Sequence, residues 1–268
     1  MISLLIFVFK FIFLMKKIAF FLTIYSFIFF QSCKEQQLKV SRIEGEEIKI
    51  TDSIASNKEL NEFIAPYANH IEKEMSAILA YAPKALAKSD SKYNTAIGNM
   101  EADAVMEMLQ PIFFSRTEDS IDGVLLNYGG IRSTINQGNV TTKTAYNIMP
   151  FENEAVVVRL SAEAMQELFN YLAKNQTAHP ISGMQLILNK NGSIEINLVQ
   201  GKPLEKDHFY YIATNDYLQK GGDHMDFLAK ADTVMQMNYK LRNLFIDYFK
   251  KKDTIAPVTD ERFIKLEK

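Results

Sequence analysis

The chain has 268 residues, a formal net charge of −2 and 23% charged residues. Hydrophobic residues make up 47% of the sequence, which is typical of a folded protein and excludes disorder over most of its length. The near-neutral charge and the lack of a basic block argue against nucleic-acid binding. A single cysteine excludes an internal disulfide.

The first part of the chain has the pattern of a targeting signal. Two lysines follow Met15 and precede an apolar run over residues 18–30, which is short for a bilayer span but has the length of a signal-peptide core. Met15 is therefore the expected true start. The residues before it are either a mis-assigned extension or an extra membrane anchor. We predict a signal peptide over residues 1–32.

The only cysteine, Cys33, directly follows this run and resembles the lipidated first residue of a bacterial lipoprotein. Phe30 and Gln31 depart from the small residues usual before such a cysteine, so secretion with a leftover thiol is the alternative. We predict a lipidated tether over residues 33–56, with one strand at residues 48–50. The expected location is the bacterial cell envelope, with a lipid anchor in the membrane and the protein facing the periplasm or the surface.

The next segment begins with helical patterns. Apolar residues at helical spacing predict a helix over residues 57–83, capped at Asn57 and broken or kinked at Pro66. A second helix is expected to open near Asn99. The apolar residues 124–128, which end at a glycine pair, predict a short buried strand.

The second half of the chain mixes strands and helices without an internal repeat. Ser161 has the position of a helix cap, and Asn191-Gly192 between two apolar runs predicts a hairpin. The expected strands are residues 154–160, 184–188, 193–199 and 209–214, and the expected helices are residues 161–175 and 240–252. We predict a single α/β (α+β) domain over residues 57–268, with mixed β-sheets layered with helices.

No catalytic or metal-binding motif stands out in the sequence. The four histidines, His70, His179, His208 and His224, lack the spacing of paired metal ligands. A Gly-x-Ser-x-Gly elbow is also missing. The sequence therefore predicts no catalytic residue, no metal site and no cofactor in this chain.

Four short motifs at the ends of predicted strands hold the remaining candidates. In NYGGIR, Asn127 begins a turn that delivers Arg132, whose planar guanidinium suits phosphate or carboxylate; a solvated turn is the equal alternative. In TNDYLQKGGD, Tyr217 and Asp223 stand on the two sides of a glycine pair. The motifs PFENEAVVV and PISGMQ contribute Phe151, Asn153 and Gly183.

In this order, the four motifs resemble the C-terminal domain of the 5'-nucleotidase family. The resemblance also includes IGNMEADAV and the closing ERFIKL, so it extends from about Asn57 to the end of the chain. It implies a substrate-binding domain. In the family, a separate N-terminal metallophosphatase domain carries two metal ions and performs the hydrolysis.

The resemblance implies that the chain holds a nucleoside. Phe151 and Tyr217 resemble the two rings that sandwich the base, although the family commonly has phenylalanine in place of Tyr217. Stacking contributes about 1–3 kcal/mol per base. Asp223 resembles the acid that accepts hydrogen bonds from the ribose hydroxyls.

The resemblance also implies roles at the edges of the ligand. Asn153 and Gly183 resemble residues beside the base, and Asn127 and Arg132 resemble residues that approach the phosphate. The family usually has arginines just before its Gly-Asn helix start. Here that stretch offers only Lys92, which lacks the bidentate fork of arginine.

These features predict the nucleotide-binding half of a split 5'-nucleotidase that acts in nucleotide catabolism. The ligand would be a nucleoside 5'-monophosphate or a related nucleotide. The residues before the resemblance are too few for the metallophosphatase domain, so we expect a separate metallophosphatase chain to carry the divalent metals. The alternatives are a non-catalytic nucleoside-binding envelope lipoprotein and an envelope scaffold without a ligand.

Overall fold

The structure is a computed structural model that describes residues 2–29, 40, 42–51 and 53–267. It divides into two units, Met1–Ser56 and Asn57–Lys268. The first unit contains the helix α1 (Ile2–Phe29). Among the described residues, no helix is both long and apolar enough to span a membrane. Cys33 lies outside the described residues, so its lipidation stays a prediction.

The predicted strand at residues 48–50 is wrong. Residues 42–50 have no regular secondary structure. Ile48 and Ile50 are 83% and 90% exposed, because no described strand pairs with this segment and no apolar surface covers it. Alternation of apolar and polar residues alone does not make a strand without such a partner.

The second unit begins with α2 (Lys58–Met75), capped as expected by Asn57, whose side chain accepts the Leu60 N–H at 3.0 Å. The helix runs through Pro66 but ends before the predicted boundary at residue 83. The next residues form β1 (Ile78–Ala82), which pairs with β3 (Gly138–Thr141) and buries alternate alanines. The sequence pattern missed this strand because its burial depends on a distant partner.

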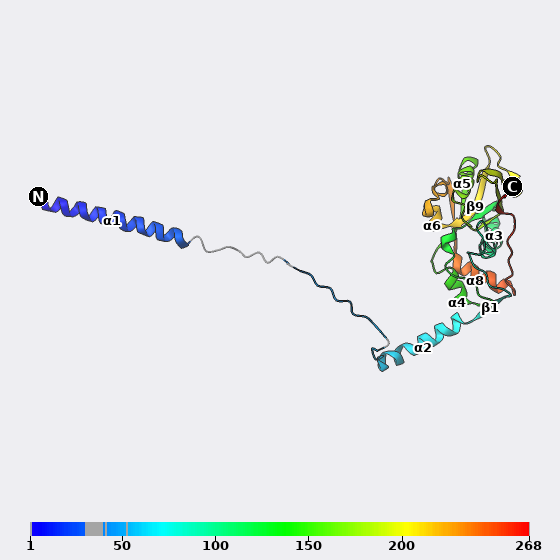
Figure 1. Ribbon diagram of the computed structural model, residues 1–268, viewed down its shortest axis with the longest axis horizontal. Helices are drawn as coiled ribbons and strands as arrows, with labels where there is room; N and C mark the ends of the chain where they lie inside the picture. The colour runs from blue at the N-terminus through cyan, green and yellow to red at the C-terminus, as the bar shows by residue number, and fades with distance from the viewer. Residues whose placement is uncertain (1, 30–39, 41, 52, 268) are drawn as a thin grey trace. The chain divides into compact units, whose positions relative to one another are not determined.

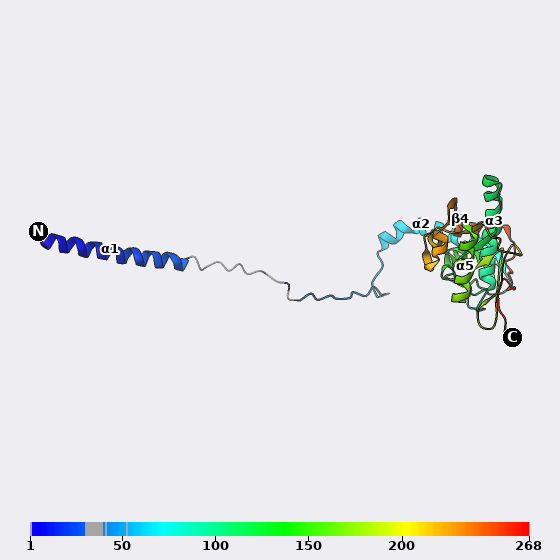
Figure 2. The ribbon, with the colours of Figure 1, turned by 90° about the horizontal axis from the view of Figure 1, so that it is seen from above.

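Three sheets lie in the described part of this unit, drawn in Figures 1 and 2. Besides the β1–β3 pair, a five-stranded sheet has the order β10 (Thr233–Lys240), β4 (Glu154–Ser161), β9 (Phe209–Asn215), β2 (Gly123–Leu125), β5 (Ile181–Ser182). A four-stranded sheet has the order β11 (Phe263–Lys265), β6 (Met184–Leu188), β7 (Ile194–Val199), β8 (Lys202–Pro203). The β2–β9 pair is parallel and the β4–β9 pair antiparallel, so the predicted mixed sheets are confirmed.

Helices complete the layers around the five-stranded sheet. The helices α3 (Ala96–Thr117), α5 (Ala162–Asn175) and α8 (Leu241–Lys251) contact this sheet, while α4 (Thr142–Ile148) packs against α8 and α7 (Asp226–Ala229) against α5. The α3 helix starts three residues before the predicted Asn99, because the Thr95 side chain caps it through the Gly98 N–H. Ser161 caps α5 as predicted, through the Ala164 N–H.

Two apolar cores lie on opposite faces of the five-stranded sheet. On β4, Val157 belongs to the core shared with α3 and α8, while Val156 and Val158 belong to the core shared with α5 and β6. All three valines are at most 2% exposed. A strand covered on both faces needs a continuous apolar run, which explains the sequence EAVVVRL.

The arrangement of strands brings three loops to one edge of this sheet. Since β2 runs parallel to β9, the segments that follow both strands leave at the same edge. Since β4 runs antiparallel to β9, with Ala155 opposite Asn215, the segment before β4 reaches that edge as well. Residues near 127, 152 and 217 therefore become neighbours.

One acidic side chain of α3 is buried in the protein. Glu101 is 0% exposed, and neither of its carboxylate oxygens has a hydrogen-bond partner among the described residues. Burial raises the pKa of Glu101 to about 8, although the positive charge of Lys88 acts in the opposite direction. The carboxyl group is therefore protonated at neutral pH in the native state.

This buried acid predicts a pH-dependent stability. From its usual pKa of 4.5 up to about 8, the native state keeps a proton that the unfolded state loses. The contribution of Glu101 is therefore fully present at low pH and is lost as the pH rises through this window. As the pH rises from about 5 to about 8, the melting temperature of Glu101→Gln should fall less than that of the wild type. The matched control is Glu195→Gln, on an exposed position of β7, which should follow the wild type.

Candidate functional site

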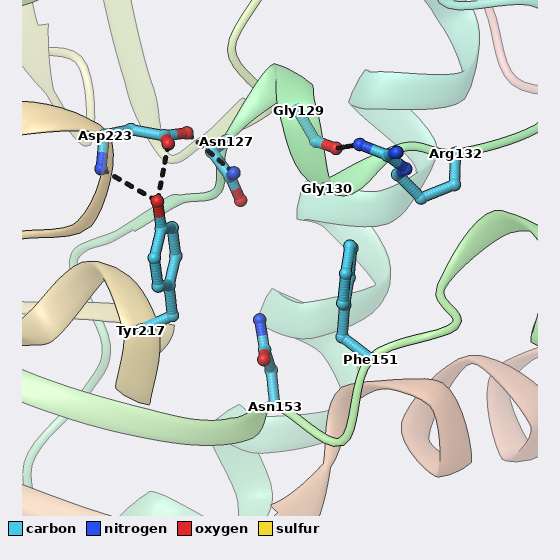
Figure 3. Close-up of a pocket in the computed structure, with 8 residues that line it drawn as sticks. All are labelled: Asn127, Gly129, Gly130, Arg132, Phe151, Asn153, Tyr217 and Asp223. Atoms are coloured by element: carbon cyan, nitrogen blue, oxygen red, sulfur yellow. Dashed lines mark hydrogen bonds between the residues drawn. The ribbon is translucent and has the colours of Figure 1, made fainter. Parts of the chain in front are cut away.

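A pocket of about 340 Å³ opens at the sheet edge where β2 and β9 end and β4 begins (Figure 3). It is lined by Asn127, Gly129, Gly130, Arg132, Phe151, Asn153, Tyr217 and Asp223. The structure thus brings together all of the predicted ligand-binding residues except Gly183. The roles assigned to them from the resemblance stay predictions.

The first wall of the pocket is the turn after β2. The predicted strand over residues 124–128 ends early, because the chain enters the short turn η1 (Tyr128–Gly130), closed by the Gly130 N–H on the Asn127 carbonyl at 2.9 Å. Asn127 is only 8% exposed. A Cβ on Gly130 would lie 3.0 Å from Asn127 Oδ1, so glycine here lets the asparagine side chain lie against its own turn.

The second wall follows β9 and contains the other glycine pair. After α6 (Asp216–Gln219), Gly221 adopts φ +88°, a left-handed conformation that glycine reaches without steric cost. Gly222 has a different reason to be glycine. A Cβ there would stand 2.6 Å from two atoms of the Tyr217 ring, so only a bare Cα lets the backbone pack against that ring.

Asp223 lies in the turn η2 (Gly222–His224) at φ 53° and ψ 27°, a left-handed conformation that is uncommon for a residue other than glycine. All of its polar atoms are engaged. Its N–H donates to Tyr217 Oη at 3.2 Å, and its carbonyl accepts from Tyr171 Oη at 2.8 Å. Its Oδ1 accepts from Tyr217 Oη at 2.8 Å and its Oδ2 from Asn127 Nδ2 at 2.7 Å. The bond to this carboxylate raises the pKa of the Tyr217 hydroxyl.

The third wall is the segment before β4. Figure 3 shows the rings of Phe151 and Tyr217 on opposite sides of the pocket, with the side chain of Asn153 rising between them. The two rings are 39% and 45% exposed, so both keep surface for a ligand. The guanidinium carbon of Arg132 lies 5.7 Å from the Phe151 ring centroid, within the range of a cation–π contact.

The Phe151 segment is held in place by a buried arginine. Arg242, which is 6% exposed, donates to the Phe151 carbonyl at 3.3 Å and pairs with Glu152. Its guanidinium also lies 4.1 Å from the Tyr146 ring centroid. Hydrogen bonds from Arg242 and Lys240 hold the pKa of Glu152 at about 2, so this carboxylate stays charged and the segment stays anchored.

Two residues that sequence reasoning missed lie outside the pocket lining and contact the turns that form it. His179 Nδ1 accepts the Tyr128 N–H at 3.2 Å, and burial lowers the pKa of this histidine to about 4, so it is neutral. Its ring lies 5.6 Å from that of Tyr171, which bonds to Asp223. Tyr171 lies in α5 and His179 in the segment after it. Neither residue belongs to one of the four motifs, so no local sequence signal marks it.

Gly183 does not line the pocket. It joins β5 to β6 at φ +69°, and a Cβ there would lie 2.4 Å from the Asp122 carbonyl oxygen. Lys92 is also absent from the lining, and its ammonium lies 5.4 Å from the Tyr93 ring centroid. Lys88 instead contacts the turn after β2, where it donates to the Ile131 carbonyl at 2.8 Å.

The described residues contain no group of three histidine, cysteine, aspartate or glutamate side chains that could hold a metal ion. The polar side-chain groups of the pocket are two amides, one guanidinium, one phenol hydroxyl and one carboxylate. Such a set can bind and orient a polar ligand through hydrogen bonds, and the two rings can stack on a planar group.

Comparison with known proteins identifies the fold and the family. Residues 76–230 match the family model of the 5'-nucleotidase C-terminal domain. The chain belongs to this family. In solved structures, it is similar to a 5'-nucleotidase precursor from Thermus thermophilus, with a TM-score of 0.65 and 22% identity over 78% of this chain and 43% of that one.

Two relatives with similar sequences are much longer than this chain. A cell wall protein of Listeria monocytogenes, Lmo0130, is 24% identical over 78% of this chain and 29% of its own length. The trifunctional nucleotide phosphoesterase YfkN of Bacillus subtilis is 23% identical over 80% of this chain and 16% of its own length. The nucleotidase-family domain described here thus spans less than a third of each of these two relatives.

The contact between Gly222 and Tyr217 predicts a displaced ring in Gly222→Ala. The new Cβ would lie 2.6 Å from ring atoms, so the exposed ring must swing away, which weakens its two hydrogen bonds to Asp223. We expect an altered chemical shift of the Tyr217 ring in NMR spectra and a modestly lower melting temperature. Gly201→Ala, where no atom lies within 4 Å, is the control: its φ of +74° costs some stability, but the Tyr217 signals should stay in place. Unchanged Tyr217 signals in Gly222→Ala would contradict the packing.

Proposed function

We propose that the chain is the nucleotide-binding component of a 5'-nucleotidase-type phosphohydrolase in nucleotide catabolism. One observation carries this proposal: two aromatic rings, Phe151 and Tyr217, stand on opposite sides of a single pocket that also contains a carboxylate (Figure 3). The pocket of about 340 Å³ is within the size range of small-molecule sites.

The chemistry of the pocket fits the parts of a nucleoside. A base between the two rings would gain about 1–3 kcal/mol of stacking on each ring. The amide of Asn153, which rises between the rings, can donate to and accept from a base edge. The Asp223 carboxylate can accept from two neighbouring ribose hydroxyls, and Arg132 at the opposite side offers a guanidinium to phosphate.

The aromatic pair generates the central prediction. Phe151→Ala and Tyr217→Ala should each weaken binding of AMP about 5- to 150-fold, because each removes one stacking face. Isothermal titration calorimetry measures the change. Phe209→Ala is the matched control, since this exposed ring lies at the other end of β9 and should leave the affinity unchanged. Wild-type affinity in both pocket variants would contradict the proposal.

A separate metallophosphatase chain is proposed to supply the divalent metals and the hydrolysis. In this family the C-terminal domain usually sits with a metallophosphatase domain, and the matched relatives extend far beyond the matched part. The helix α2, which precedes the family match, has no buried residue. Its large exposed apolar side chains follow one helical face: Leu60, Phe63, Ile64, Tyr67 and Ile71. This face offers a surface for such a partner.

The partnership predicts the activity pattern of the purified chain. The purified chain alone should release no phosphate from AMP, with or without divalent metal. A metallophosphatase domain that lacks its own C-terminal domain should release phosphate from AMP when this chain is added. Ile64→Asp should reduce this activity, because it places a charge on the apolar face, whereas Glu62→Gln on the opposite face should not. Robust metal-dependent turnover by the lone chain would contradict the split arrangement.

A non-catalytic nucleoside-binding protein is the second candidate. Among the eight residues that line the pocket, Arg132 is the cation and Asp223 the anion, so the lining is balanced in charge. Arg132 already donates to the Gly129 carbonyl at 3.3 Å. A neutral nucleoside suits this balance better than a phosphate dianion, and equal affinities for adenosine and AMP would favour this candidate.

An envelope location is part of the proposal. One relative is a cell wall protein, and the sequence before Cys33 has the pattern of an export signal. Lipidation at Cys33 would hold the domain at a membrane through the tether over residues 33–56. The binding domain would then work at the periplasmic side or at the cell surface.

A further inference from the structure

We propose that Tyr171, which lies outside the pocket, is a positioning residue that sets the preference for ribose over deoxyribose by fixing Asp223. This inference rests on the proposed function. Its physical origin is the backbone of the turn η2. Asp223 and the following His224 both have positive φ angles, 53° and 60°, which are disfavoured for residues with a Cβ. Such a turn persists only if its surroundings hold it.

The supports of Asp223 differ in where they come from. Tyr217 and Asn127 hold it from inside the pocket, where a ligand would contact the same groups. Tyr171 Oη donates to the Asp223 carbonyl at 2.8 Å and does not line the pocket. A ligand in the pocket would therefore not compete for the Tyr171 bond.

Tyr171 is itself firmly packed. It is carried by α5, whose neighbouring residues Leu168 and Leu172 are fully buried. Its ring lies 5.6 Å from the ring of His179 and 5.6 Å from the ring of Phe227. Held between two rings, the hydroxyl has a fixed position from which to hold the turn.

The same packing joins the two turns that carry the ribose-facing groups. His179 packs on Tyr171 and accepts the Tyr128 N–H at 3.2 Å, next to Asn127. Tyr171 therefore connects the two turns: it contacts the turn after β2 through His179 and the turn after β9 through Asp223. The distance of 2.7 Å between Asn127 Nδ2 and Asp223 Oδ2 depends on that relation.

The lone pairs of the carboxylate explain why its orientation matters. An ionised carboxylate offers about four acceptor positions. Tyr217 Oη uses one on Oδ1 and Asn127 Nδ2 uses one on Oδ2, which leaves one on each oxygen. Two neighbouring ribose hydroxyls need two such acceptors at once. If the turn relaxed, one contact would be lost while stacking on Phe151 and Tyr217 would remain.

The test compares adenosine with 2'-deoxyadenosine by calorimetry. In Tyr171→Phe, the ratio of the two affinities should fall about 3- to 10-fold, with little change for 2'-deoxyadenosine. Tyr239→Phe is the matched control, because it also removes a hydroxyl that donates at 2.8 Å, here to Asp247 Oδ2. The control should keep both affinities.

The outcomes separate the inference from the proposed function. If the wild type binds neither nucleoside nor AMP, the proposed function fails. If the wild type prefers ribose and Tyr171→Phe keeps the ratio, or weakens both ligands equally, the positioning role is overturned. Should Tyr171→Phe not fold, His179→Gln tests the same support. Its amide oxygen can still accept the Tyr128 N–H, but the ring packing on Tyr171 is lost and the ratio should again fall.

Discussion

The direction of three strands determines where the lining of the pocket lies. Because β2 is parallel to β9 and β4 is antiparallel to it, the segments around residues 127, 152 and 217 reach one edge of the sheet. This pairing is stabilised from both faces, since alternate valines of β4 belong to two different cores. The turns and loops that line the pocket are therefore anchored on deeply buried strands of the unit.

Much of this architecture could be predicted from short-range signals in the sequence. The caps at Asn57 and Ser161 and the hairpin between β6 and β7 follow from local rules, and all three are present. The sequence pattern predicts a helix over the residues of β1. An apolar run does not show that it will pair with a distant strand, here β3. The strand β10 escapes prediction for the same reason, since its pairing with β4 joins residues far apart in the chain.

The candidate site was predictable where its residues stand in recognisable motifs. The resemblance named six of the residues that the fold brings to one pocket, but it could not reveal Tyr171 and His179, whose contacts with the pocket turns arise only in the folded structure. Gly183 shows the opposite case. Its motif is local, yet the structure gives it a backbone reason to be glycine, away from the lining. Motifs thus indicate which residues matter, and packing shows how they are held.

The contact of Gly222 with the Tyr217 ring has a consequence for the kind of molecule that fits. The backbone at Gly222 packs against the Tyr217 ring, and Phe151 stands across the pocket, so a base held between the two rings, as proposed, would have both of its faces occupied. In a polynucleotide, each base shares its faces with its neighbours in the strand. Under the proposed function, the pocket would have to break those contacts on both sides, so free monomers would fit it better than strands.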